Sequence, residues 1–528
     1  MEKRPNIKLT LDQGLAVARD VRPDRSSEAL ASILGVERAY LLRRSVDARR
    51  KSDVHFVVTA GIGGSEGAPR AVTSIEERPL SERQAAGVRP VVVGMGPAGL
   101  FAALELAEAG LRPLVIERGA PVDERMADIE RFHCTRVLDT ASNVQFGEGG
   151  AGTFSDGKLT TGKNSPQIAQ VLETFVAAGA PSEILWQAKP HIGTDVLGGV
   201  VKRIRERIIA CGGEVRFHTQ LVGMRVDAGG LLRGITLEHD GISSEVEASR
   251  LILACGHSAR DTFALLKGLD FELAPKPFSI GVRIEHEQDF INQAQYGRMA
   301  GHPALGAADY KLACHLKGGR SVYTFCMCPG GEVVAAASEQ GGLCVNGMSR
   351  QARDGTNANA ALLCNVTPDD FPNADDPLSG IEFQRRWEQA AYVAGGSDWH
   401  APVQRVADFA GLTGEARTKP EASYPLGVVE ASLDTCLPGF AAAALREALP
   451  ALDRSLHGFA DSGALLTGIE ARSSSPVRIV RDPQTFMATR VHGVYPCGEG
   501  AGYAGGIMSA AIDGIRVANK LLGETEDK

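Results

Sequence analysis

The chain has 528 residues and a formal net charge of −8 at pH 7. This acidic balance argues against a bulk nucleic-acid binder, so we expect no DNA partner and no binding to an anionic membrane surface. Apolar residues make up 44% of the chain and charged residues 23%, which is ordinary for a globular protein of about three domains.

Residues 1–85 are predicted to form a small α/β module that ends in a charged linker near residues 76–83. Its predicted helices and strands are, in order, 11–20, 27–34, 39–43 and 54–58. No apolar stretch typical of a signal peptide follows Met1, and the apolar run 91–104 is too short and too rich in Gly to span a bilayer. We therefore expect a cytoplasmic protein without membrane insertion.

Five basic residues fall within nine positions of this module: Arg43, Arg44, Arg49, Arg50 and Lys51. A solvated charged surface is the simplest interpretation, and contact with RNA or an acidic partner is the alternative. Asp47 lies inside the cluster and offers a local ion pair of little energetic weight.

A glycine-rich motif follows the apolar run 88–93, which has the character of a strand. Gly94, Gly96 and Gly99 have the spacing G-x-G-x-x-G that precedes a helix in dinucleotide-binding folds. Gly94 permits the tight turn, and Gly96 lets backbone N–H groups approach a pyrophosphate. Gly99 lets the helix pack closely on the strand, and the helix N-terminus faces the phosphates.

A carboxylate completes this unit. The next strand, predicted over 111–116, delivers Glu117 at the separation of about 20 residues at which an acid binds the ribose hydroxyls. Strand, helix, strand and acid in this order predict dinucleotide binding.

A second glycine-rich segment near the C-terminus indicates which dinucleotide is bound. Residues 491–497 have the character of a strand that ends at Gly498 and Glu499, and residues 505–512 open a helix. A flavin needs an acidic group near its ribitol and donors near N1 and the C2 carbonyl, where negative charge collects on reduction. A glycine-rich turn at a helix N-terminus supplies such donors, so the two segments together predict FAD.

Motifs spread over nearly the whole chain resemble one family. They are residues 117–119, 143–158, 284–286, 322–331, 474–478 and the C-terminal block. These motifs resemble the bacterial FAD-dependent dehydrogenases of the glutathione-reductase-like flavoprotein superfamily, a family that is largely uncharacterised. The resemblance implies an FAD-dependent oxidoreductase that transfers hydride between flavin N5 and a small-molecule substrate, and it identifies neither that substrate nor the electron donor or acceptor.

The expected fold class is α/β, with a Rossmann-like FAD-binding domain, an inserted α+β substrate domain and the N-terminal module. The FAD-binding domain is predicted over residues 88–270 and 458–528, and the insert over 271–457. The insert is expected to contain strands and one long helix, namely 279–284, 321–326, 333–338 and 381–394.

Two further segments fit the superfamily pattern. Residues 213–221 resemble the strand beside adenine, with Leu221 as the contact, and residues 250–257 resemble the third glycine motif, which ends at Gly256. Glu499 departs from the pattern because many members place Asp there. The predicted FAD-binding residues are Gly94, Gly96, Pro97, Ala98, Gly99, Glu117, Arg118, Gly152, Leu221, Gly256, Gly498, Glu499, Gly506, Ile507 and Met508.

Catalytic candidates are polar residues expected near the flavin, because the cofactor transfers the hydride while the protein orients substrate and moves protons. Asp156 and Lys158 follow the first βαβ unit, and His191 precedes a helix. His191 exchanges a proton with substrate near neutral pH, caps that helix or bonds to the cofactor. Glu285, His286 and Glu339 are further candidates, for which a structural role is favoured over a catalytic one. Arg472 and Arg478 either bind an anionic substrate or anchor the loop near the flavin.

The 10 Cys show no metal-ligand pattern, so no metal site is predicted, and their scatter indicates reduced thiols. Cys326 and Cys328 are the exception. A dithiol beside a flavin could relay electrons, although the usual redox spacing is C-x-x-C and small apolar Cys residues often simply pack. Cys497 is expected in the core near the flavin.

No second nucleotide-binding unit is evident, because neither 61–64 nor 147–152 opens a helix. Two enzymatic schemes stay open. Either a substrate is oxidised and its electrons pass to another acceptor, or NAD(P)H binds transiently as donor and a substrate is reduced. The alternative from another class is a flavin-binding redox sensor or an RNA-associated flavoprotein that uses the basic N-terminal module.

Overall fold

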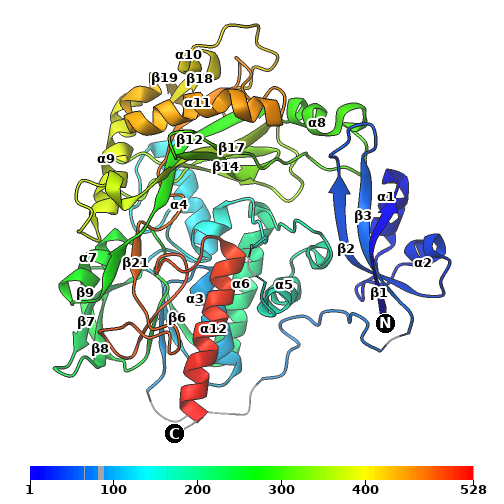
Figure 1. Cartoon of the computed structure of the whole chain (residues 1–528). Helices are drawn as coiled ribbons and strands as arrows, with labels where there is room; N and C mark the ends of the chain where they lie inside the picture. The colour runs from blue at the N-terminus through cyan, green and yellow to red at the C-terminus, as the bar shows by residue number, and fades with distance from the viewer. Residues whose placement is uncertain (65, 81–87, 163, 527–528) are drawn as a thin grey trace.

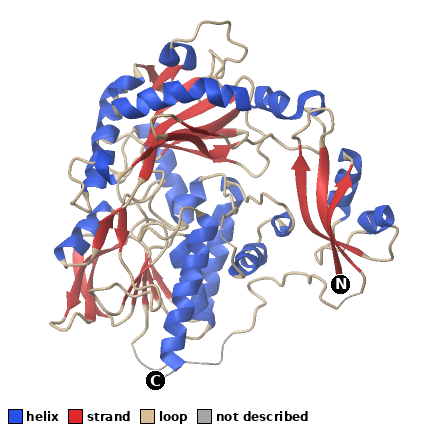
Figure 2. Ribbon diagram, in the orientation of Figure 1, coloured by secondary structure: helices blue, strands red, loops and turns tan. Residues whose placement is uncertain are grey.

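A computed structural model describes residues 1–64, 66–80, 88–162 and 164–526 (Figure 1). Residues 81–83 of the expected linker lie outside the described ranges. Figure 2 shows a small N-terminal sheet beside the strands and helices of the main body. Within the described residues no helix is long and apolar enough to cross a membrane.

A five-stranded parallel sheet forms the centre of the first large unit, with strand order β22-β10-β4-β5-β6. Its strands are β4 (Val91–Val93), β5 (Leu114–Ile116), β6 (Glu214–Arg216), β10 (Leu251–Leu253) and β22 (Val494–Pro496). Most of their side chains are apolar and buried, as in a parallel sheet that is covered on both faces. The predicted Rossmann-like architecture is therefore confirmed.

The two faces of this sheet pack into two different cores because successive strand residues point to opposite sides. Val92 belongs to the core shared with the helices, whereas Val91 and Val93 belong to the core shared with an antiparallel sheet. The helices of the first face stand together in Figure 1: α3 (Pro97–Glu108), α5 (Gln167–Ala177), α6 (Thr194–Ala210) and α12 (Ile507–Glu526). The antiparallel sheet is β7 (Thr219–Val226), β8 (Leu232–His239) and β9 (Ile242–Glu247).

The prediction of a single strand over residues 213–221 is wrong, because the chain bends between β6 and β7. His218 has a left-handed φ of 49°, and its N–H donates to the Gly119 carbonyl at 3.1 Å. Residues before the bend join the parallel sheet, and residues after it join the antiparallel sheet.

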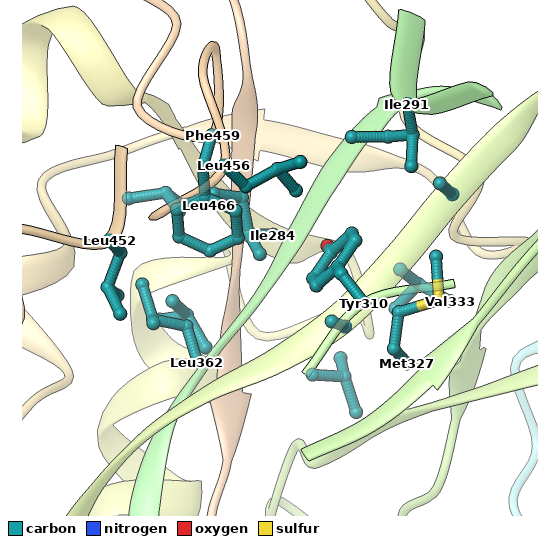
Figure 3. Packing of buried hydrophobic residues seen from close by; sticks show 14 of the residues in the cluster. Ile284, Ile291, Tyr310, Met327, Val333, Leu362, Leu452, Leu456, Phe459 and Leu466 are labelled. Atoms are coloured by element: carbon teal, nitrogen blue, oxygen red, sulfur yellow. The ribbon is translucent and has the colours of Figure 1, made fainter. Parts of the chain in front are cut away.

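A seven-stranded sheet forms the second large unit, with order β13-β14-β17-β12-β20-β18-β19. Its strands are β12 (Phe278–Glu287), β13 (Ala313–His315), β14 (Ser321–Cys328), β17 (Asn357–Val366), β18 (Ala401–Arg405), β19 (Val428–Glu430) and β20 (Leu465–Glu470). Helix α11 (Gly439–Ser455) lies across it (Figure 1), and Figure 3 shows the packed side chains, among them Leu452, Leu456, Phe459, Ile284, Leu362 and Leu466.

The remaining elements flank these sheets. The helices are α4 (Val122–Thr135), α7 (Arg260–Gly268), α8 (Gln288–Tyr296), α9 (Ser379–Ala394) and α10 (Val406–Ala410). Two strand pairs are β11 (Leu273–Pro275) with β21 (Val477–Ile479), and β15 (Gly331–Ala335) with β16 (Val345–Ser349).

Strand β20 bears on the division of the chain into domains. It falls inside residues 458–528, which the sequence assigned to the FAD-binding domain, yet it pairs with β12 and β18 of the seven-stranded sheet. We therefore propose that the inserted unit ends after Glu470 and that the chain returns to the parallel sheet from there.

The N-terminal unit contains the two predicted helices, α1 (Leu11–Asp20) and α2 (Glu28–Leu34), and a sheet of β1 (Glu2–Leu9), β3 (His55–Ile62) and β2 (Ala39–Asp47). Arg44 of β2 is stacked between the rings of Phe56 and Trp186, and its backbone N–H donates to the Trp186 carbonyl at 2.7 Å. Arg49 pairs with Asp47. Part of the basic cluster is thus engaged in docking the module and in a local ion pair.

The contact between α12 and α3 yields a test of this packing. A Cβ atom added at Gly514 would lie 2.1 Å from the Ala98 carbonyl oxygen, which belongs to the backbone and cannot rotate away. We expect Gly514→Ala to lower the free energy of unfolding by about 1 kcal/mol or more, despite the better helix propensity of Ala. Thermal melting monitored by circular dichroism measures the change.

Gly523→Ala in the same helix is the matched control, because nothing lies within 4 Å of its added Cβ. It should leave the melting temperature unchanged or raise it slightly. Equal melting temperatures for both variants would contradict the close approach of α12 to α3.

Candidate functional site

A cavity of about 310 Å³ lies where the carboxyl ends of the parallel strands face the seven-stranded sheet. Val93, Ile116 and Ala254 line it from β4, β5 and the end of β10. Cys326 and Glu470 line it from β14 and β20. This is the place at which doubly wound sheets bind their ligands, and the volume is within the range of cofactor sites.

The three glycines of the motif at β4 have two different roles. A Cβ added at Gly94, whose φ is 95°, would lie 2.3 Å from the Ala254 carbonyl oxygen, and one at Gly99 would lie 1.9 Å from the Gly94 carbonyl oxygen. Both therefore allow close packing of strand, turn and helix. A Cβ at Gly96 would find its nearest neighbour at 3.8 Å, because Gly96 borders the open cavity at the N-terminus of α3.

Glu117 at the end of β5 holds the loops around this end of the cavity. Its buried carboxylate accepts hydrogen bonds from the backbone N–H groups of Met95 at 2.8 Å and of Gly119 and Gly147, both at 3.0 Å. Since a carboxylate has about four acceptor sites, Glu117 can hold these loops and still accept from a ribose hydroxyl. Its position in the cavity lining fits a dinucleotide.

Most of the predicted FAD-binding residues are in the cavity lining. These are Gly94, Gly96, Pro97, Ala98, Glu117, Arg118, Gly152, Leu221, Gly256, Glu499, Gly506 and Ile507. Gly99, Gly498 and Met508 are not. Gly498 donates its N–H to Asp513 at 2.9 Å, and Met508 is buried among the helices, so both support the wall from behind.

His257 is a cavity residue that the sequence analysis missed. Its Nδ1 lies 3.5 Å from the Glu499 carboxylate, and its Nε2 is buried without a hydrogen-bond partner in the described part of the chain. A buried nitrogen of this kind is costly unless a ligand or water satisfies it, which fits a polar cofactor in the cavity. The only available signal was its place directly after Gly256.

The three catalytic candidates occupy different positions. Lys158 lines the cavity, and its ammonium group donates to the Asp156 carboxylate at 2.8 Å and to the Met327 carbonyl. Asp156 is fully buried behind it and also accepts from Arg353, so it fixes the position of Lys158.

His191 lies outside the cavity lining. Its Nε2 contacts the Gln351 carbonyl at 3.1 Å, and burial lowers its pKa. Glu285 and His286 are buried within the seven-stranded sheet, where their side chains bond to neighbouring segments.

Glu470 lines the cavity from the seven-stranded sheet and forms an ion pair with Arg283, which is buried behind it. Arg283 donates from Nε to Glu470 at 2.5 Å and from its other nitrogens to Asn346 at 2.6 Å and to the Cys326 carbonyl at 2.9 Å. Burial raises the pKa of Glu470 to about 7, although Arg283 opposes the shift. Glu470 and Asn346 line the cavity, and no local motif indicated either of them.

Arg472 also lines the cavity, but its guanidinium is directed to protein partners. It forms two hydrogen bonds of 2.8 Å to Glu388, which in turn accepts two from Arg260 at 2.7 and 3.0 Å. All three side chains are buried. Of the two roles considered for Arg472, binding an anionic substrate or anchoring the loop, these contacts favour anchoring.

The parallel sheet, the glycine turn at α3 and the acid after β5 define a dinucleotide-binding flavoprotein fold. The chain matches the family model for a FAD binding domain over residues 89–127 and the model for a FAD-dependent protein, C-terminal domain-like, over residues 277–473. An uncharacterized protein from Clostridium beijerinckii is 44% identical over 533 residues, covering 98% of both chains. The chain belongs to this family of FAD-dependent proteins, as the sequence motifs predicted.

The solved structures that match the chain are more distant. Glycine oxidase from Bacillus cereus is 11% identical with a TM-score of 0.33, covering 83% of this chain and 96% of its own. A flavoprotein/dehydrogenase from Cytophaga hutchinsonii is 13% identical with a TM-score of 0.35, covering 84% of this chain and 79% of its own. Similarity at this level does not bear on activity.

The open space at Gly96 leads to a test of the cofactor site. We expect Gly96→Leu to abolish FAD binding, because its side chain would extend into the space beside the α3 N-terminus, where the nearest protein atom to the added Cβ lies at 3.8 Å. Bound FAD is measured by absorbance after denaturing the purified protein, and circular dichroism reports the fold.

Gly318→Leu, on an exposed loop with nothing within 4 Å of the added Cβ, is the control and should retain FAD. Stoichiometric FAD in folded Gly96→Leu would refute the assignment of the glycine turn.

Proposed function

We propose that the protein is an FAD-dependent dehydrogenase that transfers hydride between flavin N5 and a small-molecule substrate. The observation that carries this proposal is the cavity itself. One end is formed by the glycine turn and Glu117, which suit the ADP half of FAD, and the other is formed by ionisable side chains from β14 and β20. FAD, when bound, supplies the two-electron chemistry, and the chain supplies binding, orientation and charge.

The proposed cofactor contacts follow from the cavity lining. The N-terminus of α3 would hold the pyrophosphate, Glu117 the adenosine ribose, and Glu499 with His257 the ribitol region. Lys158 and Arg283 place two cations near the opposite wall. Fixed cations there would stabilise the negative charge that a flavin ring acquires on reduction.

Glu470 is proposed as the proton-exchanging group of this site. It lines the cavity, and a carboxyl group with a pKa of about 7 can both donate and accept a proton near neutral pH. Arg283 holds its carboxylate in one orientation. Glu470 replaces His191 as the candidate for proton exchange, because Glu470 lines the cavity and His191 does not.

The electron partner is the part of the proposal to test first. The seven-stranded sheet is antiparallel except between β18 and β19. This parallel pair is connected through the five-residue helix α10, and no glycine turn like that at β4 lies between β18 and α10. NAD(P)H, if it is the donor, would therefore enter the substrate end of the cavity. We expect the purified protein to show a flavin absorbance band.

This band is recorded under anaerobic conditions while NADH, and separately NADPH, is added. Bleaching by either would establish a nicotinamide donor and a substrate-reducing enzyme. A band that persists with both, yet is bleached by dithionite, would exclude a nicotinamide donor and would point to substrate oxidation or to a non-catalytic flavin module. Absence of a flavin band after reconstitution with FAD would overturn the proposed function.

The pKa of Glu470 gives a prediction that needs no substrate. In FAD-loaded protein the carboxyl group should lose its proton as the pH rises through about 7, and the new negative charge should shift the visible band of the oxidised flavin. Absorbance spectra taken across neutral pH measure this transition. In Glu470→Gln the transition should disappear, because the amide does not titrate.

Glu105→Gln is the matched control. Burial also raises the pKa of Glu105 to about 7, but this residue lies on α3 outside the cavity lining. The spectral transition should persist in Glu105→Gln. Its loss there, or its persistence in Glu470→Gln, would contradict the placement of the flavin ring beside Glu470.

The basic N-terminal module suggested RNA binding as an alternative. Stacking of Arg44 between Phe56 and Trp186 and pairing of Arg49 with Asp47 account for two of the five basic residues without RNA. Neither contact favours the alternative, so the dehydrogenase alone is proposed.

A further inference from the structure

Cys326 and Cys328 lie at an irregularity of β14 beside the cavity. The pairing of β14 with β17 shifts register between Phe325 and Cys328, and Cys326 has a left-handed φ of 39°. A non-glycine residue with positive φ is uncommon, and β-bulges are over-represented next to active sites, where they re-aim a side chain. Here the irregularity coincides with a cavity-lining cysteine.

The two thiols differ in exposure. Cys326 is partly exposed and lines the cavity, whereas Cys328 is fully buried. The Cys328 thiol donates to the Cys326 carbonyl oxygen at 3.2 Å, which keeps its sulfur beside the Cys326 backbone. On a regular strand, residues two apart lie about 7 Å apart between Cα atoms, at the limit for a disulfide, and the irregularity at Cys326 departs from that spacing.

Two cations fix the charge state of this pair. Lys158 donates to the Met327 carbonyl between the two cysteines, and Arg283 donates to the Cys326 carbonyl at 2.9 Å. Cys328, Lys158 and Arg283 lower the pKa of Cys326 against the effect of burial. The interaction with Cys326, together with burial, raises the pKa of Cys328. Loss of a proton from this pair is therefore favoured at Cys326.

A third cysteine shows that a position in the cavity lining does not by itself lower the pKa of a thiol. Cys255 also lines the cavity, near the ADP end, and burial raises its pKa to about 12. The thiol pKa is thus lowered at Cys326, where Lys158 and Arg283 lie close, and not at Cys255.

We propose that Cys326 and Cys328 are a redox-active dithiol that exchanges two electrons with the flavin. This inference rests on the proposed function, which brings the flavin ring to the Cys326 end of the cavity. The residues on which it depends are contributed by β14, β12 and the loop that contains Lys158.

The electron transfer balances without a further reactant. In the forward direction the S–S bond would form from the Cys326 thiolate and the Cys328 S–H bond would break, which releases two electrons and one proton. FAD, when bound in its oxidised state, would supply the acceptor for both electrons and the proton. Lys158 and Arg283 would stabilise the negative charge before and after the transfer, because both cations lie beside this end of the cavity. In the reverse direction the disulfide would take the two electrons and the proton back.

The first test measures the thiols and does not depend on FAD or on activity. Full-length protein is oxidised mildly with diamide, unfolded, alkylated and analysed by peptide mass spectrometry. We expect the peptide that contains Cys326 and Cys328 to lose two hydrogens and to take up no alkylating reagent, while the other eight of the 10 Cys are alkylated. Alkylation of both Cys326 and Cys328 after oxidation would overturn the proposal.

The second test counts electrons in FAD-loaded protein. After mild oxidation, anaerobic titration with dithionite should require four electrons per flavin in the wild type and two in Cys326→Ser and Cys328→Ser. Cys314→Ser is the control, because Cys314 lies on the neighbouring β13 outside the cavity lining, and it should still require four. Two electrons in the wild type would refute the dithiol even if the flavin is reduced normally.

The two tests separate the two proposals. A disulfide in the first test combined with failure to bind FAD would refute the proposed function and with it the exchange with flavin. Normal FAD binding and reduction without a disulfide would refute the dithiol alone. The thiol analysis uses wild-type protein, so the conclusion stands even if a serine variant fails to fold.

Discussion

The carboxylate of Glu388 is the point on which the enclosure of the cavity depends. It is fully buried and is shared between the guanidinium groups of Arg260 and Arg472. Burial opposes its ionisation, but the two cations hold the pKa of Glu388 well below its usual value. Removal of one partner from such a group leaves a buried unpaired charge, at a cost of roughly 3–5 kcal/mol.

This charge cluster also joins three parts of the chain that are far apart in sequence. Arg260 begins α7 behind the parallel sheet, Glu388 belongs to α9 of the inserted unit, and Arg472 follows β20 on the way back. Arg472 and the neighbouring Ser258 line the cavity and are bonded to each other at 3.2 Å. The two large units are therefore held together beside the site that each of them only half encloses.

Local sequence predicted the part of the site that is built from contiguous residues. Strand β4, the glycine turn, helix α3 and Glu117 follow one another within one short segment, so their spacing alone defines the ADP end. The other end could not be predicted in this way. Glu470 faces the cavity only because β20 pairs with β12, nearly two hundred residues earlier, and no residue pattern near Glu470 records that pairing. Asn346 and the irregularity at Cys326 were missed for a related reason, because the first is placed by a hydrogen bond from Arg283 and the second by the register shift against β17, and neither contact is recorded in local sequence.

The C-terminal position of β22 and α12 has a consequence for the order in which this protein can fold. Strand β22 pairs with β10, and α12 packs along α3, so the cofactor-binding sheet is assembled from both the first and the last parts of the main body. During synthesis, α3 and β10 emerge long before α12 and β22, which pack against them. The inserted unit is also synthesised completely before β22, the last strand of the parallel sheet. Contacts of such large sequence separation form slowly, because long loops must close before the contacts can stabilise them. The cofactor site is thus among the last parts of a nascent chain to become complete.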